Sequence, residues 1–326
     1  MGDVRPRVAV SSCLLGEPVR FNGGHSRDRF LTGALSEHVD WVPICPEMEI
    51  GLGTPRETIR LERSAGGLRL MTRSSRVDLT DRMTALAESR AAGLDVDGYV
   101  FKAKSPSCGL HGIPIHAAGA GTPDAGGARV DADRRNRGLF AGIVVGAHPL
   151  LAAEDEGRLR DTVLREAFVE RIFAVARLRE LLSGGWRARD LVAFHAAHKM
   201  QLLAHAPEIY RGLGRLVAEV GSRPRDVLAA EYGHAFRTAL AARASVGRNA
   251  NVLEHCLGMV GGHLGRIRRA DVLEVIGAYR ARLVALNVPV TLLRHHARGE
   301  GVAYVSDQTY FQPYPDDLGL RNHIAA

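Results

Sequence analysis

The fold is decided by the stretch RVAVSSC at residues 7–13, a short apolar run that passes into a polar loop carrying a cysteine. Such a run, bounded by turn-forming residues, is typical of a short buried strand. The same pattern returns as WVPIC at residues 41–45 and as GYVFKAKSPSC at residues 98–108. Each cysteine therefore follows the carboxyl end of a predicted strand, which in open α/β sheets is the edge where ligands bind.

The segments around these strands predict two domains. A helix is predicted over residues 80–92, and strands alternating with helices indicate an α/β domain with a mostly parallel sheet. A long amphipathic helix is expected over residues 159–182, and Ser183-Gly184-Gly185 breaks it. We place the domain boundary there, giving an α/β domain over residues 1–185 and an all-α domain over residues 186–326. Apolar spacing of helical period supports the second domain; it occurs over residues 191–204, 226–242, 251–264 and 271–286.

Length and composition are those of a globular protein with more than one core. The chain has 326 residues, of which 46% are hydrophobic and 24% charged. No apolar run is long enough for a membrane span, and the N-terminal segment does not resemble a signal peptide. We therefore expect a cytoplasmic protein without a membrane partner. Four cysteines do not form a disulfide framework in a reducing compartment.

The basic charge is concentrated in the predicted helical domain. Residues 1–185 contain 25 Lys and Arg against 24 Asp and Glu, whereas residues 186–326 contain 18 against 12. The second domain also holds 9 of the 14 histidines. Such an excess favours a polyanionic partner, although Arg-rich proteins without one share this property.

The spacing of the cysteines leaves three interpretations open. Cys13 and Cys45 are separated by 31 residues, and Cys45 and Cys108 by 62, so no local Cys-x-x-Cys pair of a zinc site is present. The three residues could hold a metal or cluster, one could be a catalytic thiol, or all could simply be buried. Three thiolates suit a 4Fe-4S cluster in which one iron keeps an open position and acts as a Lewis acid. Cys256 lies in a predicted helix, where we expect it to be buried.

Several motifs of the first domain resemble the thiouracil desulfidase family, in the right order over residues 7–180. The matching segments are SSCLLG at 11–16, VRFNGG at 19–24, CPE at 45–47, GLGTPR at 51–56, KSPSCG at 104–109, EDEGRL at 154–159 and LRE at 164–166. The resemblance implies that Cys13, Cys45 and Cys108 carry a 4Fe-4S cluster. It also implies a non-redox, hydrolase-type removal of sulfur from a thiolated uracil, with Glu47 as acid or base and Ser105 as the hydroxyl that orients it. Ser107 is the alternative hydroxyl.

From about residue 191 the chain resembles a second family, long known as a domain of unknown function. The matching segments include FHAAHK at 194–199, LAH at 203–205, YRGLG at 210–214, NVLEH at 251–255, LLRHH at 292–296 and LRNH at 320–323. The fusion of the two resembles the tRNA 4-thiouridine desulfidases, in which the extra domain is thought to hold RNA. The implied function is desulfuration of 4-thiouridine in tRNA to uridine, with release of sulfide.

Candidate RNA contacts follow from position and charge. Phosphate contacts from basic side chains position RNA without reading its sequence. The candidates are Lys102, Lys104, His195, His198, Lys199, Arg211, Arg294 and Arg321. The two lysines could instead be a solvated strand end, and the histidines could be buried.

Two other functions remain open at this point. The protein could act on free thiouracil or thio-UMP, with the helical domain mediating oligomerisation. It could also be a non-catalytic iron–sulfur protein that binds RNA or senses sulfur. No obligate protein partner is evident from the sequence, and an oligomer is possible.

Overall fold

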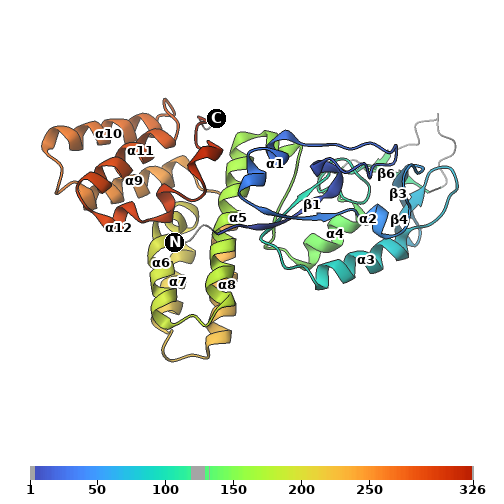
Figure 1. The fold of residues 1–326 in the computed structure, drawn as a ribbon, viewed down its shortest axis with the longest axis horizontal. Helices are drawn as coiled ribbons and strands as arrows, with labels where there is room; N and C mark the ends of the chain where they lie inside the picture. Colours follow the sequence, from blue (N-terminus) through green and yellow to red (C-terminus); the bar gives the residue numbers. More distant parts are fainter. Residues whose placement is uncertain (1–3, 119–128, 132, 325–326) are drawn as a thin grey trace. The chain divides into compact units, whose positions relative to one another are not determined.

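The N-terminal unit is built on a parallel sheet. The computed structural model describes residues 4–118, 129–131 and 133–324. The strands β1 (Arg7–Ser11), β2 (Asp40–Ile44), β5 (Gly98–Phe101) and β8 (Ala152–Asp155) lie in the order β2-β1-β5-β8, and all neighbours are parallel (Figure 1). β1 and β5 are almost wholly buried, as strands of a parallel sheet usually are. The predicted α/β fold with a mostly parallel sheet is confirmed.

A second, mixed sheet adjoins this core and was not predicted. It has the order β4-β3-β6-β7, in which β3 (Ile59–Ser64) pairs antiparallel with β4 (Gly67–Thr72) and parallel with β6 (Ile115–Ala117). β7 (Arg129–Asp131) pairs antiparallel with β6. One hydrophobic cluster joins both sheets to the helices α3 (Thr80–Ala92) and α4 (Leu139–Ala147). The bounds of α3 are those predicted.

Short helices complete this unit. They are η1 (Ser12–Leu15), α1 (Arg29–Thr32), η2 (Leu35–Glu37), α2 (Pro46–Glu49) and η3 (Arg158–Arg160). Two of them, η1 and α2, begin where β1 and β2 end. The first two cysteines thereby lie just beyond the carboxyl ends of these strands.

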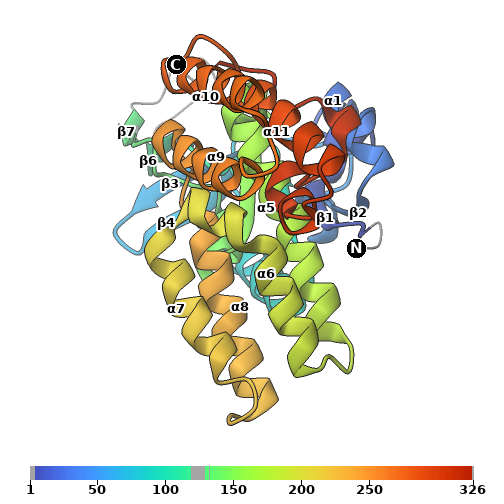
Figure 2. The same ribbon diagram turned by 90° about the vertical axis from the view of Figure 1, so that its left-hand side faces the viewer.

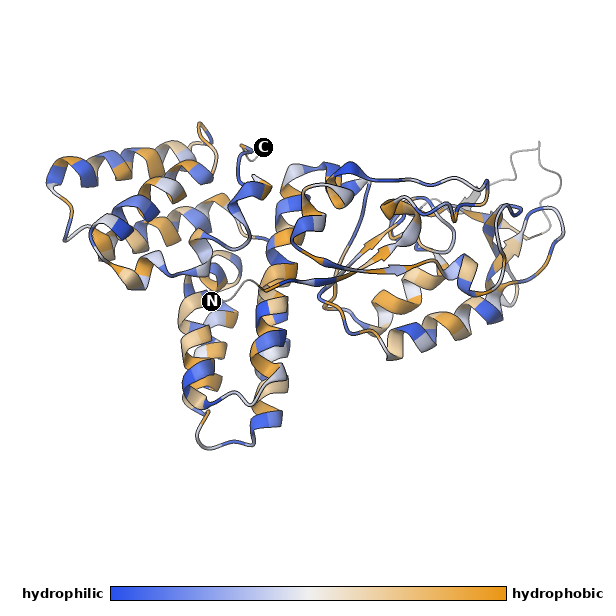
Figure 3. Cartoon of the chain, in the orientation of Figure 1, coloured by the Kyte–Doolittle hydropathy of each residue, from blue (hydrophilic) through white to orange (hydrophobic). Residues whose placement is uncertain are grey.

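The second unit is helical in the part of the chain that the structure describes, as predicted. Its elements are α5 (Thr162–Ser183), α6 (Ala188–His205), α7 (Pro207–Ala218), α8 (Arg225–Ala241), α9 (Val246–Val260), α10 (Arg266–Arg280), α11 (Asn287–Gly299), α12 (Ala303–Ser306), η4 (Thr309–Phe311) and η5 (Asp316–Leu318). Figure 2 shows α6, α7 and α8 side by side, and α9, α10 and α11 in a second group. The helices of both groups carry apolar and polar residues side by side (Figure 3).

The chain divides between Asp161 and Thr162, and the boundary predicted at residue 185 is therefore displaced. The reason is α5, whose Ala174 and Leu178 are buried in one cluster with Leu191, Tyr232 and other residues of α6 and α8. Ser183-Gly184-Gly185 is only the turn between two helices of the same unit. With this boundary, residues 162–326 contain 22 Lys and Arg against 15 Asp and Glu, and residues 1–161 contain 21 of each.

The described helices include none that is both long and apolar enough to cross a membrane.

Candidate functional site

Three adjacent strands deliver the three cysteines to one place. Cys13 lies in η1 directly after β1, Cys45 is the residue before α2 directly after β2, and Cys108 follows β5 through a short loop. Because β1 lies between β2 and β5 and all three are parallel, their carboxyl ends meet at the same edge. The three thiols line one cavity of about 380 Å³. The predicted convergence of these residues is thus present in the structure.

The turn that presents Cys108 is held by its neighbours. The Ser105 hydroxyl accepts hydrogen bonds from the backbone N–H groups of Ser107 (3.3 Å) and Cys108 (3.1 Å). Gly109 follows, and a Cβ there would lie 2.7 Å from the backbone carbonyl oxygen of Ser105, so a side chain cannot be added without moving the turn. Ser105 therefore helps to fix the position of the thiol.

The pKa values of the three thiols determine whether a thiol can act as a nucleophile. Cys13 and Cys108 are buried, and Cys45 is half-buried. Burial raises the pKa of the Cys13 thiol to about 11, and it also raises the pKa of Cys45 and of Cys108. The carboxylate of Glu47 raises the pKa of Cys108 further, whereas the ammonium group of Lys102 lowers the pKa of Cys13 and offsets part of the effect of burial. Thiols held in the protonated form are poor nucleophiles, which disfavours the catalytic-thiol interpretation.

The same set of donors fits a thiophilic metal group. Metal binding displaces the protons of cysteine ligands and so offsets the cost of ionising buried thiols. Among the described residues that line the cavity there is neither a histidine nor a fourth cysteine, so a tetrahedral zinc site of Cys and His is not formed. Three thiols in one cavity match the cysteine set of a 4Fe-4S cluster with one iron left without a cysteine.

A carboxylate and two hydroxyl groups lie beside the thiols. Glu47, in the first turn of α2, lines the cavity, and its Oε1 accepts a hydrogen bond of 2.5 Å from Ser107. Ser105 lines the cavity as well, with its Oγ 2.9 Å from Oγ of Ser107 and 3.4 Å from Oε1 of Glu47. Ser107 is fully buried and does not reach the cavity surface. The structure thus brings Glu47 and Ser105 together, as predicted, and adds Ser107 as the closer partner of the carboxylate.

The other oxygen of Glu47 is held by Arg56, a residue for which the sequence predicted no role. Nε and Nη2 of Arg56 donate to Oε2 of Glu47 at 2.9 and 2.6 Å. The Arg56 side chain is only 6% exposed. Arg56 lies in the GLGTPR segment, which matches the family, and this match could have marked it as a site residue. The segment itself does not show that the guanidinium is buried.

The basic residues of the cavity fall into two kinds. Lys102 forms an ion pair with Glu156 and donates to the carbonyl oxygen of Ala103 (3.0 Å), so its charge already has a partner; its predicted phosphate contact stays a prediction. Arg56 is likewise paired. Lys104, which is exposed, and Arg20 also line the cavity, and neither side chain forms an ion pair with another described residue.

Three predicted RNA contacts of the helical unit are interior residues. His198 is fully buried, with Nδ1 2.8 Å from the carbonyl oxygen of Phe194. His195 is buried as well, with Nδ1 3.2 Å from the Tyr232 hydroxyl. Arg321 is buried and pairs with Glu166 at 2.9 Å. These side chains stabilise the helical unit, and the prediction that they face RNA is wrong.

The remaining candidates have intramolecular partners of their own. Lys199 is half-buried, with its ammonium 5.8 Å from the centre of the Tyr304 ring. Arg211 is exposed and pairs with Glu208 at 2.5 Å, and Arg294 pairs with Asp316 at 3.1 Å. Cys256 is fully buried in the core around α9, as predicted.

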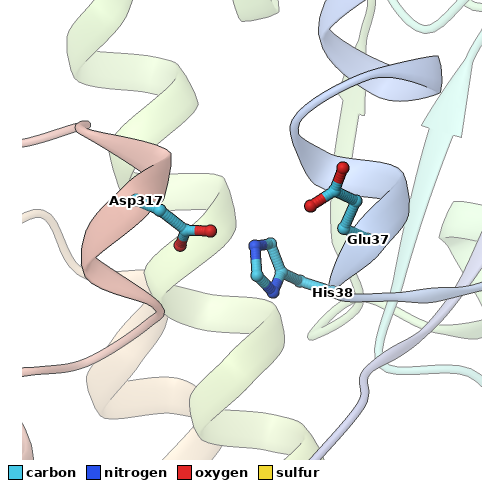
Figure 4. Close-up of side chains that lie close together, drawn as sticks. All are labelled: Glu37, His38 and Asp317. Atoms are coloured by element: carbon cyan, nitrogen blue, oxygen red, sulfur yellow. The ribbon is translucent and has the colours of Figure 1, made fainter.

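Figure 4 shows the side chains of Glu37 and His38, at the end of η2, together with Asp317. The first two belong to the N-terminal unit and Asp317 to the helical unit. We assign no metal site to these three residues, because they belong to different units.

Comparison with known proteins places this geometry in a family. The model of the 2-thiouracil desulfurase family matches residues 8–156, which include the three cysteines and Glu47. The protein YbbK of Bacillus subtilis is 31% identical over 110 residues, covering 31% of this chain and 72% of YbbK. The chain belongs to the 2-thiouracil desulfurase family.

A second family model and two further proteins are also similar to this chain. Residues 199–315 match the model of a protein of unknown function, DUF1722. YbgA of Escherichia coli is 29% identical over 153 residues, covering 47% of this chain and 90% of YbgA. A solved structure, the 4Fe-4S-dependent thiouracil desulfidase TudS, is 25% identical with a TM-score of 0.37, covering 51% of this chain and all of that one.

Proposed function

We propose that this desulfurase-family protein removes sulfur from 4-thiouridine in tRNA, producing uridine and sulfide without a net redox change. The observation that carries the proposal is the cavity in which three cysteines from three strands meet beside Glu47. The reaction consumes one water: a C=O bond replaces the C=S bond at C4, and sulfur leaves as hydrogen sulfide. When bound by Cys13, Cys45 and Cys108, a 4Fe-4S cluster would supply an iron able to take up the substrate's sulfur.

Within this proposal Glu47 is the group that handles protons. Its carboxylate lies at the cavity surface, where it can accept a proton from the water that attacks C4 and return one to the departing sulfur. Arg56 holds one oxygen of the carboxylate and Ser107 the other, so the side chain is fixed before substrate arrives. Ser105 lies at the cavity surface next to both groups and can orient the water.

Two basic side chains of the cavity are able to bind a phosphate group. Arg20 and Lys104 are cations without an acidic partner among the described residues, and a phosphate group would supply the missing negative charge. We expect Arg20→Ala and Lys104→Ala each to raise KM for 4-thiouridine 5′-monophosphate by about 10- to 100-fold. KM for 4-thiouridine without phosphate should stay within about twofold. Steady-state sulfide release with both substrates measures this.

Arg29→Ala is the matched control, because Arg29 is exposed in the same unit and does not line the cavity. It removes the same charge and should leave both KM values unchanged. If Arg20→Ala raises KM equally for both substrates, Arg20 does not bind the phosphate but supports the cluster or the fold.

The helical unit supports a tRNA substrate through its charge, because it carries the net positive excess of the chain. One exposed group lies at the start of α10, where Arg266 and Arg269 form no ion pair with another described residue. We expect Arg266→Ala and Arg269→Ala each to weaken tRNA binding several-fold. Each should also lower the slope of log Kd against log salt concentration by about one, the amount expected for one lost phosphate contact. Turnover of 4-thiouridine monophosphate should not change. Filter binding at several salt concentrations measures the effect.

Arg280→Ala provides the control on the same helix, because Arg280 is exposed but paired with Glu254 at 2.7 Å. It should weaken tRNA binding by less than about twofold. If all three variants weaken binding alike, the start of α10 is not a specific contact.

A second candidate function is desulfuration of a free thiolated nucleotide, with the helical unit serving oligomerisation. The specific observation in its favour is that Arg20 and Lys104 lie in the N-terminal unit itself, so a mononucleotide needs no second unit. The test of both functions is anaerobic loading of the chain with iron and sulfide, followed by incubation with thiolated tRNA, 4-thiouridine monophosphate and 4-thiouracil. Loss of the near-ultraviolet absorbance of tRNA-borne 4-thiouridine supports the first function. Turnover of the nucleotide without tRNA affinity supports the second, and a stable cluster without any sulfide release overturns both.

A further inference from the structure

Arg56 is bonded to two parts of the cysteine cavity at once. On one side Nε and Nη2 hold Oε2 of Glu47. On the other side, Nη2 donates to the carbonyl oxygen of Val19 at 2.9 Å. The backbone N–H of Arg56 donates to the carbonyl oxygen of Phe21 at 2.8 Å. Nη1 donates to the carbonyl oxygen of Gly53 at 2.6 Å. The side chain of Arg56 therefore joins the carboxylate of Glu47 to the carbonyl group of Val19, and the backbone of Arg56 adds a bond to Phe21.

Residues 19–24 form a turn, and side chains of this turn line the cavity. The turn is closed by the hydrogen bonds from Arg20 N to Gly24 O (3.1 Å) and from Gly23 N to Arg20 O (2.9 Å), and Gly23 has φ of 75°, which favours glycine. The carbonyl oxygen of Arg20 accepts a further bond from the Thr54 hydroxyl at 2.9 Å. Arg20 and Phe21 line the cavity, and Phe21 is 40% exposed. The backbone of this turn is thus tied to residues 54–56 at three consecutive carbonyl groups.

The chemistry of the guanidinium group explains why an arginine is needed here. Its planar fork donates several hydrogen bonds in fixed directions, so it can hold a carboxylate and backbone carbonyl groups together. A lysine ammonium keeps the charge but not the fork. A change in the position of Arg56 would move Glu47 and the turn together, and small misplacements of catalytic groups are costly.

We propose that Arg56 is a positioning residue that fixes Glu47 relative to the substrate-facing turn at residues 19–24. This rests on the proposed function in that the substrate enters the cysteine cavity. Arg56 acts through Glu47 and through Arg20 and Phe21, and it does not itself contact the reacting atoms. Its role predicts two effects that a general loss of stability would not produce together.

The first effect is on the backbone of the turn and needs no activity. Hydrogen exchange of the iron-loaded full chain should be followed in the peptide covering residues 17–25. Arg56→Gln should speed exchange of the Arg20 and Gly23 amides by at least about threefold, because the turn loses the bond from Nη2 to the carbonyl oxygen of Val19, although the bonds from the backbone N–H of residue 56 and from Thr54 remain. Glu47→Gln should not, because Glu47 is not bonded to the turn in the structure. Arg60→Gln is the control, since Arg60 is also a buried arginine in an ion pair, with Glu62 at 2.6 Å.

The second effect is kinetic and uses a double-mutant cycle. Arg56→Gln should lower kcat by about 10- to 100-fold in the parent chain, but by less than about threefold in the Glu47→Gln background. Arg56→Lys should restore part of kcat. If Arg56→Gln cannot be purified in folded form, Arg56→Lys serves for both measurements.

Unchanged exchange in the turn would overturn the proposal, and so would an equal loss of kcat in both backgrounds. If the parent chain releases no sulfide from any substrate, the proposed function fails. The exchange measurement still decides whether Arg56 anchors the turn.

Discussion

Replacing Cys45 by alanine is expected to abolish both iron binding and sulfide release. Cys45 is one of three thiols in the cavity, and a cluster held by two cysteines would lose a second iron ligand. We expect the same result for Cys13→Ala and Cys108→Ala. Iron content, the visible absorbance of the cluster and the rate of sulfide release should all fall to background in each variant.

Cys256→Ala is the matched control for this experiment. Cys256 is a buried thiol too, but it lies in the core of the helical unit. Its removal should leave iron content and turnover unchanged and only lower stability, by about 1 kcal/mol for a small lost side chain. Iron retained at the parental level in all three cavity variants would contradict the assignment of the cluster ligands.

Replacing Glu47 by glutamine is expected to lower kcat by about 10²- to 10⁴-fold while the cluster is retained. The glutamine side chain keeps the shape of the carboxylate but cannot accept a proton, which is the contribution assigned to general acid–base catalysis. The absorbance of the cluster and KM should change little. Sulfide release by the iron-loaded variant, measured over a range of substrate concentrations, separates these quantities.

Glu57→Gln distinguishes this effect from a general change of charge. Glu57 lines the same cavity, but its carboxylate accepts hydrogen bonds from the backbone N–H groups of Ser74 (2.8 Å) and Ser75 (3.0 Å). We expect kcat of Glu57→Gln to stay within about threefold of the parent chain. If kcat of Glu57→Gln falls as far as kcat of Glu47→Gln, the assignment of proton transfer to Glu47 is contradicted.

The convergence of the cysteines could be predicted because it depends on a local pattern. Each thiol comes directly after, or one short loop after, an apolar strand, and parallel strands bring such loops to one edge. The bounds of α3 follow equally from local signals. Glu47 was predictable through its resemblance to a known motif, and the structure places it at the cavity surface.

Other features depend on tertiary contacts that no local pattern contains. Arg56 reaches Val19 and Glu47, which lie 37 and 9 residues away, and only the folded chain shows that its guanidinium is buried between them. His195 and His198 share a helix face by spacing, but spacing does not tell whether that face is turned to water. The helix α5 looked like the end of the first unit because its packing partner α8 comes some 60 residues later.

The parallel order β2-β1-β5 has a consequence for how the protein matures. Because the ligands come from residues 13, 45 and 108, no stretch of nascent chain contains a preformed iron-binding loop, and β1 must first be inserted between strands made later. Loading with iron and sulfide therefore has to follow completion of the sheet. Conversely, loss of β1 from the sheet would separate the ligands, so metal retention reports on whether β2, β1 and β5 remain paired.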